Sequence, residues 1–236
     1  TTKQPLTPTI KTLLAIKITH GLLFLHRFRI VHGTLNSMNI LIDSNGDPLI
    51  HNYGLFALYN HPIPFDPRWG APELSNSESW NEKVDSFSLA MILWELYTEQ
   101  IPYEGVMEED GTIYEDDLPE LPAGIPDQLG TLIQRCWQTD PFKRPSMNSI
   151  YRLLVQPTCF FPGTDQNTVN AAIEELKQRF VPKDNPCVPN SDVPKQDKVD
   201  NVKVAIKTLF RDEKPPKLFD ELAILFEDEH YKRLLA

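Results

Sequence analysis

Two short stretches carry the polar residues whose types and spacing could support chemistry. Residues 30–41 read IVHGTLNSMNIL and place an imidazole, a hydroxyl and two amides close together, at His32, Thr34, Asn36 and Asn39. Further along, HNYGL adds the amide of Asn52. A threonine hydroxyl has no useful basicity at pH 7, and Mg²⁺ is a hard cation that prefers carboxylates to neutral amide oxygens. These two stretches therefore offer polar side chains but no carboxylate that could act as a general base or bind a cation.

The patterns around these stretches predict the elements that position them. Residues 10–26 carry apolar side chains at helical spacing after a Thr-Pro-Thr start signal, which predicts a mostly buried helix. Residues 40–54 indicate two short strands around an Asn-Gly turn. Residues 84–98 are apolar almost all round, as is typical of a helix at the centre of a domain.

Three further helices are expected towards the C-terminus, over residues 127–138, 146–156 and 167–180. Ser146 has the right type and place to cap the second of them. The proline-rich stretch 56–72 predicts irregular structure.

In order and spacing, these signatures resemble the C-terminal lobe of a eukaryotic protein kinase, most closely the tyrosine-kinase-like group. The resemblance covers about residues 10–155 and rests on GLLFLH, HGTLNSMNIL, NYG, GAPE, KVDSFSLAMILWEL and CWQTDPFKRPS. It implies a mainly α-helical lobe over residues 1–156, with a short β-hairpin that carries the catalytic-loop equivalents. The N-terminal lobe, with its Gly-rich loop and strand lysine, is not found in the chain, which also begins with Thr1; we expect a fragment.

The family's catalytic loop normally begins His-Arg-Asp, followed later by a metal-binding Asp-Phe-Gly. In this chain Gly33 replaces the arginine, Thr34 the catalytic aspartate, and Asn36 the lysine. Asn52 replaces the metal-binding aspartate, so Asn39 and Asn52 are degenerate metal candidates. Loss of a general base commonly lowers a rate by about 10²–10⁴. We therefore expect no functional catalytic residue.

The resemblance also implies structural roles for residues that the chain keeps. The glutamate matching Glu73 pairs with the arginine matching Arg144, and the aspartate matching Asp85 ties the central helix to the catalytic-loop backbone. A buried charge is costly to leave unpaired, so maintenance of the fold explains all three residues. His32 is expected to support the loop through hydrogen bonds and not to act in catalysis.

Gly33 stands where regulated kinases carry the arginine that binds a phosphorylated activation loop. This substitution accompanies the loss of the catalytic aspartate at Thr34. Residues 55–69 contain no Ser or Thr and only one Tyr, Tyr59. This pattern predicts a loop held by proline and aromatic packing, with no phosphorylation switch.

Composition limits the partners and the compartment. The net charge of −10 argues against a nucleic-acid partner, and the acidic run over residues 106–120 is more typical of a solvated loop than of a binding surface.

Three cysteines without metal-ligand spacing suit a reducing compartment. No uninterrupted apolar run reaches the ~18 residues of a membrane span, and no signal peptide is recognisable. We expect a cytoplasmic, intracellular protein without a membrane partner.

The chain beyond residue 156 is not covered by the resemblance. We expect a helical extension over residues 157–180, a flexible linker over 181–200 and a helical segment over 201–236. The last segment places four apolar side chains on one helical face, which would either dock into a partner's groove or pack back on the lobe: Leu218, Leu222, Leu225 and Phe226. The packing alternative is favoured.

Three functions remain open. The leading hypothesis is a catalytically inactive pseudokinase that binds other proteins, for example an active kinase, as a scaffold or allosteric partner in signalling. The first alternative is a weakly active serine/threonine kinase that recruits a carboxylate from Asp43 or Asp47, although both lie where turn chemistry explains them. The second is an interaction module carried by the C-terminal helices. No cofactor is expected, and ATP with Mg²⁺ would require an intact form with an N-terminal lobe.

Overall fold

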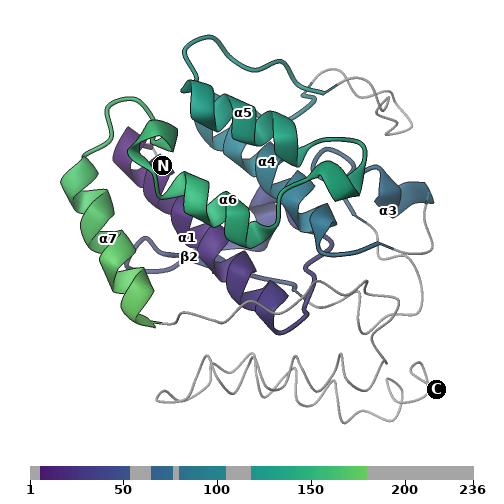
Figure 1. The fold of residues 1–236 in the computed structure, drawn as a ribbon, viewed down its shortest axis with the longest axis horizontal. Coiled ribbons are helices and arrows are strands. Elements are labelled where there is room, and N and C mark those ends of the chain that lie inside the picture. Colours follow the sequence, from purple (N-terminus) through teal and green to yellow (C-terminus); the bar gives the residue numbers. More distant parts are fainter. Residues whose placement is uncertain (1–5, 54–64, 77–79, 105–117, 180–236) are drawn as a thin grey trace.

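The computed structural model is built mainly of α-helices, with one small antiparallel hairpin (Figure 1). It describes residues 6–53, 65–76, 80–104 and 118–179. Tyr59, most of the acidic run, the expected linker and the expected C-terminal helical segment lie outside these residues.

Helix α1, Pro8–Arg27, runs through the domain and packs against three other helices, α4, α6 and α7, and against strand β2 (Figure 1). The Thr7 hydroxyl accepts a hydrogen bond from the backbone N–H of Ile10 at 3.3 Å, and Pro8 occupies the first turn, where its missing N–H does no harm.

Helix α1 is long and apolar enough to satisfy the criteria for a membrane span, which long apolar core helices can also satisfy. Half of its apolar stretch is buried against the rest of the domain.

The hairpin lies against α1 and consists of β1, Ile40–Ile42, and β2, Pro48–Ile50. The strands pair antiparallel, with Leu41 opposite Leu49. Gly21 permits close approach between helix and hairpin, because a Cβ atom there would lie only 2.8 Å from Cδ1 of Ile50. In the turn, Gly46 has a φ of +83°, which a glycine adopts without strain.

Helix α4, Lys83–Thr98, is the central element expected from its apolar sequence. Its residues from Val84 to Trp94 are all buried, and it packs on α1 and α5. Short α3, Glu73–Asn76, precedes it. Helix α5, Asp127–Cys136, and helix α6, Met147–Leu154, complete the bundle, with the Ser146 hydroxyl accepting from the N–H of Ser149.

Three single-turn 3₁₀ helices, η1, η2 and η3, connect the larger elements. They comprise Ser37–Asn39, Pro141–Lys143 and Pro157–Cys159. The buried thiols lie in this bundle: burial raises the pKa of Cys136 to about 12 and that of Cys159 to about 11. Neither cysteine forms a reactive thiolate near neutral pH.

The extension after residue 156 packs into the same hydrophobic core as the lobe. Cys159, Phe160 and Phe161 are buried, and helix α7, Gln166–Arg179, lies along α1 (Figure 1). The hydroxyl of Thr12 in α1 accepts from the N–H of Phe161 at 3.1 Å. The Phe161 ring lies 5.6 Å from that of Tyr97 in α4. The extension is therefore an integral part of the domain.

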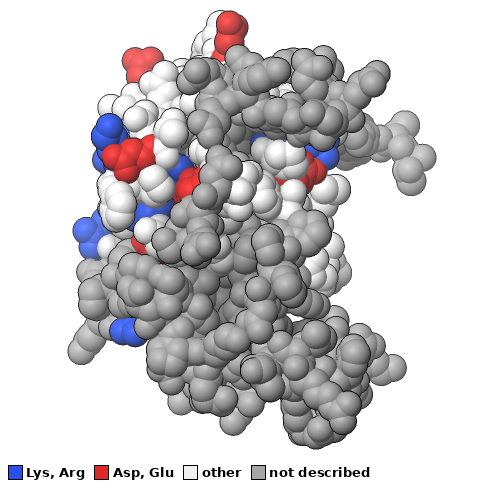
Figure 2. Space-filling view, turned by 90° about the vertical axis from the view of Figure 1, so that its right-hand side faces the viewer, with Lys and Arg blue, Asp and Glu red and all other residues white. Residues whose placement is uncertain are grey.

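Acidic and basic side chains are mixed over the described part of the face shown in Figure 2. The negative net charge is not gathered into one acidic field among the described residues of that face.

The packing of α7 can be tested by a cavity-forming substitution. Ile173 is 6 % exposed on the face that meets the core, whereas Asn170 is exposed on the same helix. We expect Ile173→Ala to lower the free energy of unfolding by about 2–4 kcal/mol, because it removes buried methyl groups and leaves a void. Asn170→Ala is the matched control and should change it by less than about 0.5 kcal/mol. Equal effects in denaturant unfolding would contradict the described packing.

Candidate functional site: a degenerate catalytic loop

Asp85, in the first turn of α4, lies at the centre of the candidate site. Its side chain is fully buried and accepts three hydrogen bonds. Oδ2 accepts from the backbone N–H of His32 at 2.8 Å and from Nε2 of His26 at 2.7 Å, while Oδ1 accepts from the N–H of Gly33 at 2.8 Å. Burial alone would raise the pKa of Asp85, but the hydrogen bond and charge of His26, with the Gly33 N–H, hold the pKa below its ordinary value.

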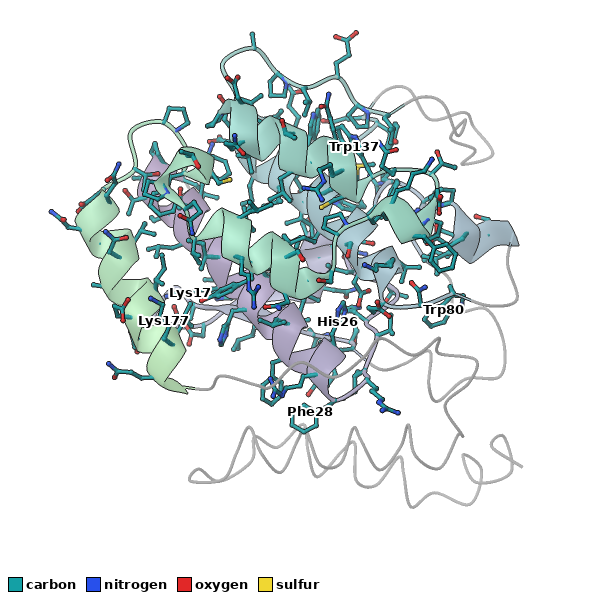
Figure 3. All side chains as sticks on the ribbon, viewed as in Figure 1. Lys17, His26, Phe28, Trp80, Trp137 and Lys177 are labelled. Atoms are coloured by element: carbon teal, nitrogen blue, oxygen red, sulfur yellow. The ribbon has the colours of Figure 1, made fainter. Side chains whose placement is uncertain are left out.

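His26 was not singled out by the sequence, yet it completes the set of donors to Asp85. It belongs to the last turn of α1, at the end of the helix visible in Figure 3. The signal that could have found it is a histidine in the last turn of a helix, directly after the apolar run from Leu22 to Leu25. His26 and Asp85 are 59 residues apart in the sequence, so their contact depends on the tertiary fold.

Gly33 has a φ of +77°, in the left-handed region that disfavours side chains. Its N–H points at Asp85 in this conformation. Gly33 thus lets the loop turn without backbone strain.

His32 is buried and held as a neutral ring. Its Nε2 lies 2.9 Å from the carbonyl oxygen of His51, which can only accept, so Nε2 carries the proton. Nδ1 then accepts weakly from the backbone N–H of Thr34, at 3.4 Å, and lies 3.5 Å from its hydroxyl. Burial lowers the pKa of His32, and the negative charge of Asp85 only partly opposes this. The ring connects the catalytic loop to the segment after β2.

The two amides expected at the metal position bind each other. Nδ2 of Asn39 donates to the carbonyl oxygen of Thr34 at 2.8 Å, which fixes the orientation of that amide because a carbonyl cannot donate. Oδ1 of Asn39 is then left to accept from Nδ2 of Asn52 at 2.9 Å. Asn36 supports the same turn, since its Oδ1 accepts from the N–H of Asn39 at 3.0 Å.

This arrangement does not fit a magnesium ion. Asn52 directs an N–H at the oxygen of Asn39 that would have to face the cation, and both groups are neutral. Asn52 has a φ of +62°, a conformation that asparagine tolerates. Within the described residues, no group of three His, Cys, Asp or Glu side chains could hold a metal ion.

Asp43 and Asp47, the other carboxylates near the loop, are engaged in the hairpin. Oδ1 of Asp43 accepts from the N–H groups of Asn45 and Asp47, both at 2.8 Å, and these turn hydrogen bonds keep the pKa of Asp43 low. Asp47 forms an ion pair with Lys17 of α1. Both side chains thus have structural partners in the hairpin.

A second buried ion pair joins α3 to the segment before α6. The Arg144 side chain is fully buried, and its Nη1 and Nη2 donate to the two carboxylate oxygens of Glu73 at 2.6 and 2.9 Å. Further Arg144 donors reach the carbonyl oxygens of Gln138, Thr139 and Lys83. The ring of Phe87 lies 5.1 Å from the guanidinium carbon. Such complete pairing is what a buried guanidinium requires.

Glu95, in the last turn of α4, joins the loop to the segment before α3. It accepts hydrogen bonds from the side chains of Ser37 and Trp69, the latter at 3.0 Å from Nε1. Burial raises the pKa of Glu95, although these two bonds and the charge of Arg68 oppose the rise. The sequence did not identify this contact, because neither partner belongs to a charged motif.

Comparison with known proteins identifies the family. Residues 1–154 match the family model described as protein tyrosine and serine/threonine kinase. The chain belongs to this family.

Its relatives carry kinase names in several organisms. A probable serine/threonine-protein kinase of Dictyostelium discoideum is 36% identical over 149 residues, covering 60% of this chain and 16% of that protein. The dual specificity protein kinase pyk3 of the same organism is 36% identical over 140 residues, or 55% and 10%. The serine/threonine/tyrosine-protein kinase HT1 of Arabidopsis thaliana is 31% identical over 162 residues, or 64% and 42%. The chain therefore spans less than half the length of each of these relatives.

The buried carboxylate can be tested by Asp85→Asn. An amide would direct an N–H at one of the three donors that now face the carboxylate, leaving it unpaired. We expect the free energy of unfolding to fall by about 3–5 kcal/mol. The exposed Asp127→Asn serves as control and should change it by less than about 0.5 kcal/mol.

The effect of Asp85→Asn should depend on pH. The lowered pKa of Asp85 gives stability that is present above about pH 4 and lost as the pH falls through the folded-state value. The gap between wild type and variant should therefore narrow below about pH 4. A variant as stable as wild type near neutral pH would contradict this role.

The neutral His32 predicts a different pH dependence. Its pKa is lower in the folded state than the ordinary value of about 6.5, so the unfolded chain binds the proton first as the pH falls. We expect thermal stability to fall as the pH decreases below about 6.5, with a shallower slope in His32→Gln, whose amide can still donate to the carbonyl of His51. Parallel slopes for the two proteins would show that His32 does not carry this dependence.

Proposed function

We propose that this protein is a pseudokinase: a protein kinase family member whose loop is maintained as a structural and binding unit and does not transfer phosphate. The observation that carries the proposal is the hydrogen bond that Nδ2 of Asn52 donates to Oδ1 of Asn39. In an active kinase these two positions hold the magnesium ions that neutralise the transferring phosphoryl group.

Thr34, the residue at the position of the family's general base, supports the same proposal. Thr34 faces His32, whose accepting nitrogen lies 3.5 Å from the threonine hydroxyl. The imidazole has a lowered pKa and its other nitrogen is engaged by the His51 carbonyl. A weakly basic, buried imidazole that bridges two backbone segments is suited to support, and a threonine cannot accept the proton of a substrate hydroxyl at neutral pH.

The intact support network explains how the fold persists without the chemistry. The three donors to Asp85 and the full pairing of Arg144 involve backbone groups and side chains other than those at 34 and 52. Substitution at the catalytic positions therefore leaves these two buried charges paired. A domain of this kind would act through its surfaces, as a scaffold or an allosteric partner of another protein.

Weak kinase activity is the alternative favoured by family membership, because the relatives described above are named as kinases. It requires a longer form of the protein that supplies a second wall to the nucleotide site and a cation held without the Asn39–Asn52 bond. The two proposals differ in one measurable property, metal-dependent phosphate transfer.

Radiolabelled phosphate transfer distinguishes them. We expect this chain, and any longer natural form, to transfer no phosphate from ATP to itself or to a general protein substrate, with either Mg²⁺ or Mn²⁺. Thermal unfolding with saturating ATP and metal should show no shift, whereas a ligand at a hundred times its dissociation constant would add about 2.7 kcal/mol.

The Asn39→Ala variant is the control for a contaminating kinase. Metal-dependent transfer that is present in the wild type and lost in Asn39→Ala would contradict the pseudokinase proposal. Transfer that persists unchanged in the variant would be assigned to a contaminant.

A further inference from the structure

A groove at the C-terminal end of α4 lies apart from the Asn39–Asn52 pair and has a volume of about 1090 Å³. One wall is the end of α4 with residues 100–104, and the other is formed by residues 118–123, which lead towards α5 and can be followed in Figure 1. Pockets for small ligands usually measure roughly 300–1,000 Å³, so this groove has room for a segment of polypeptide.

The two walls are joined by direct contacts. Nε1 of Trp94 donates to the carbonyl oxygen of Glu120 at 2.8 Å, which connects the second wall to α4. Tyr103 has a φ of +58°, a conformation that bulky residues adopt rarely and only where their surroundings fix it. The hydrogen bond from Trp94 therefore fixes the second wall against α4, and the backbone of Tyr103 holds an uncommon conformation in the lining.

The chemistry of the lining favours a cationic ligand that donates hydrogen bonds. Glu104 and Glu120 are exposed acidic residues of the lining, and Pro119 and Pro122 lack the backbone N–H that could serve an anion. None of the described residues that line the groove is a Lys or an Arg. The nearby guanidinium of Arg68 is engaged by both carboxylate oxygens of Asp66, at 2.9 and 2.6 Å.

The aromatic and aliphatic residues of the groove lining favour an arginine side chain over other cations. Rings of Trp94, Tyr97 and Tyr103 contribute to the lining, and aromatic faces attract guanidinium groups, which can also stack on them. Ile101 is 39 % exposed beside them and offers contact to the methylene stem of a long basic side chain. An arginine presents five donors together with a flat face, so it matches this lining better than a lysine.

We propose that this groove binds an arginine-containing basic segment of a partner protein. The guanidinium groups would pair with Glu104 and Glu120 and stack on the aromatic lining, while the negative net charge of −10 favours approach of a basic partner. The inference goes beyond the pseudokinase proposal and does not depend on it, because the groove contains neither Asn39 nor Asn52.

The test measures binding of fluorescein-labelled octa-arginine to the whole chain by fluorescence anisotropy, at about 0.15 M ionic strength, where the Debye length is about 8 Å. We expect saturable binding that the double variant Glu104→Gln/Glu120→Gln weakens about fivefold to tenfold. Tyr103→Ala should weaken it about threefold, through the loss of a ring. Octa-lysine should bind less tightly than octa-arginine.

A control with the same change in charge separates the groove from general attraction. Glu174→Gln/Glu175→Gln alters two carboxylates of α7, outside the groove lining, and should change the dissociation constant by less than about twofold. Equal weakening by the two double variants, or no binding to the wild type, would overturn the proposal. Equal affinity for octa-lysine would overturn its preference for arginine, and thermal unfolding checks that each variant is folded.

Discussion

The buried carboxylate of Asp85 is the constraint on which the candidate site depends. A charge withdrawn from water must be paired or solvated by protein dipoles, and here three donors from two segments converge on it. Two of these donors are backbone N–H groups of the catalytic loop, so satisfying the charge fixes the loop against α4. The third donor, His26, fixes the end of α1 to the same point. The loop therefore keeps its shape for reasons that do not involve phosphate transfer.

The main helices could be predicted from the sequence because apolar periodicity reports which face is buried. The helices expected over 10–26 and 84–98 lie at Pro8–Arg27 and Lys83–Thr98, and the Asn-Gly turn indicated the hairpin correctly. The expected helix over 146–156 ends earlier, at Leu154, with Pro157 opening a separate 3₁₀ turn. Pattern alone gave the elements, with errors of a few residues at their ends.

Contacts between distant segments could not be predicted in the same way. The burial of Phe160 and Phe161 follows from their meeting with α1 and α4, and no periodic pattern marks a three-residue turn. The orientation of the amides of Asn39 and Asn52 depends on the Thr34 carbonyl, whose position is set by the loop. The residue types predicted a poor metal site. The hydrogen bond between the two amides could be found only in the three-dimensional structure.

In this domain, the residues that stabilise the fold are different from the residues at the positions that would take part in phosphate transfer. Asp85, Arg144 and Glu73 are paired within the interior, while the substitutions at 34 and 52 fall on positions whose replacement leaves those pairs intact. The extension through α7 adds to the same core beyond the family match, which ends at residue 154. The groove at the end of α4 is one surface of this domain with a defined set of lining residues.

The central claim is that Asn39 and Asn52 bind each other in place of a cation, and NMR of their side-chain amides tests it most directly. Paramagnetic Mn²⁺ complexed with ATP would be titrated into ¹⁵N-labelled protein, with the side-chain amide of exposed Asn170 as a reference. The account predicts that the Asn39 and Asn52 resonances broaden no more than that of Asn170. Saturable broadening confined to Asn39 and Asn52 would show that the two amides form a metal–nucleotide site, and would contradict it.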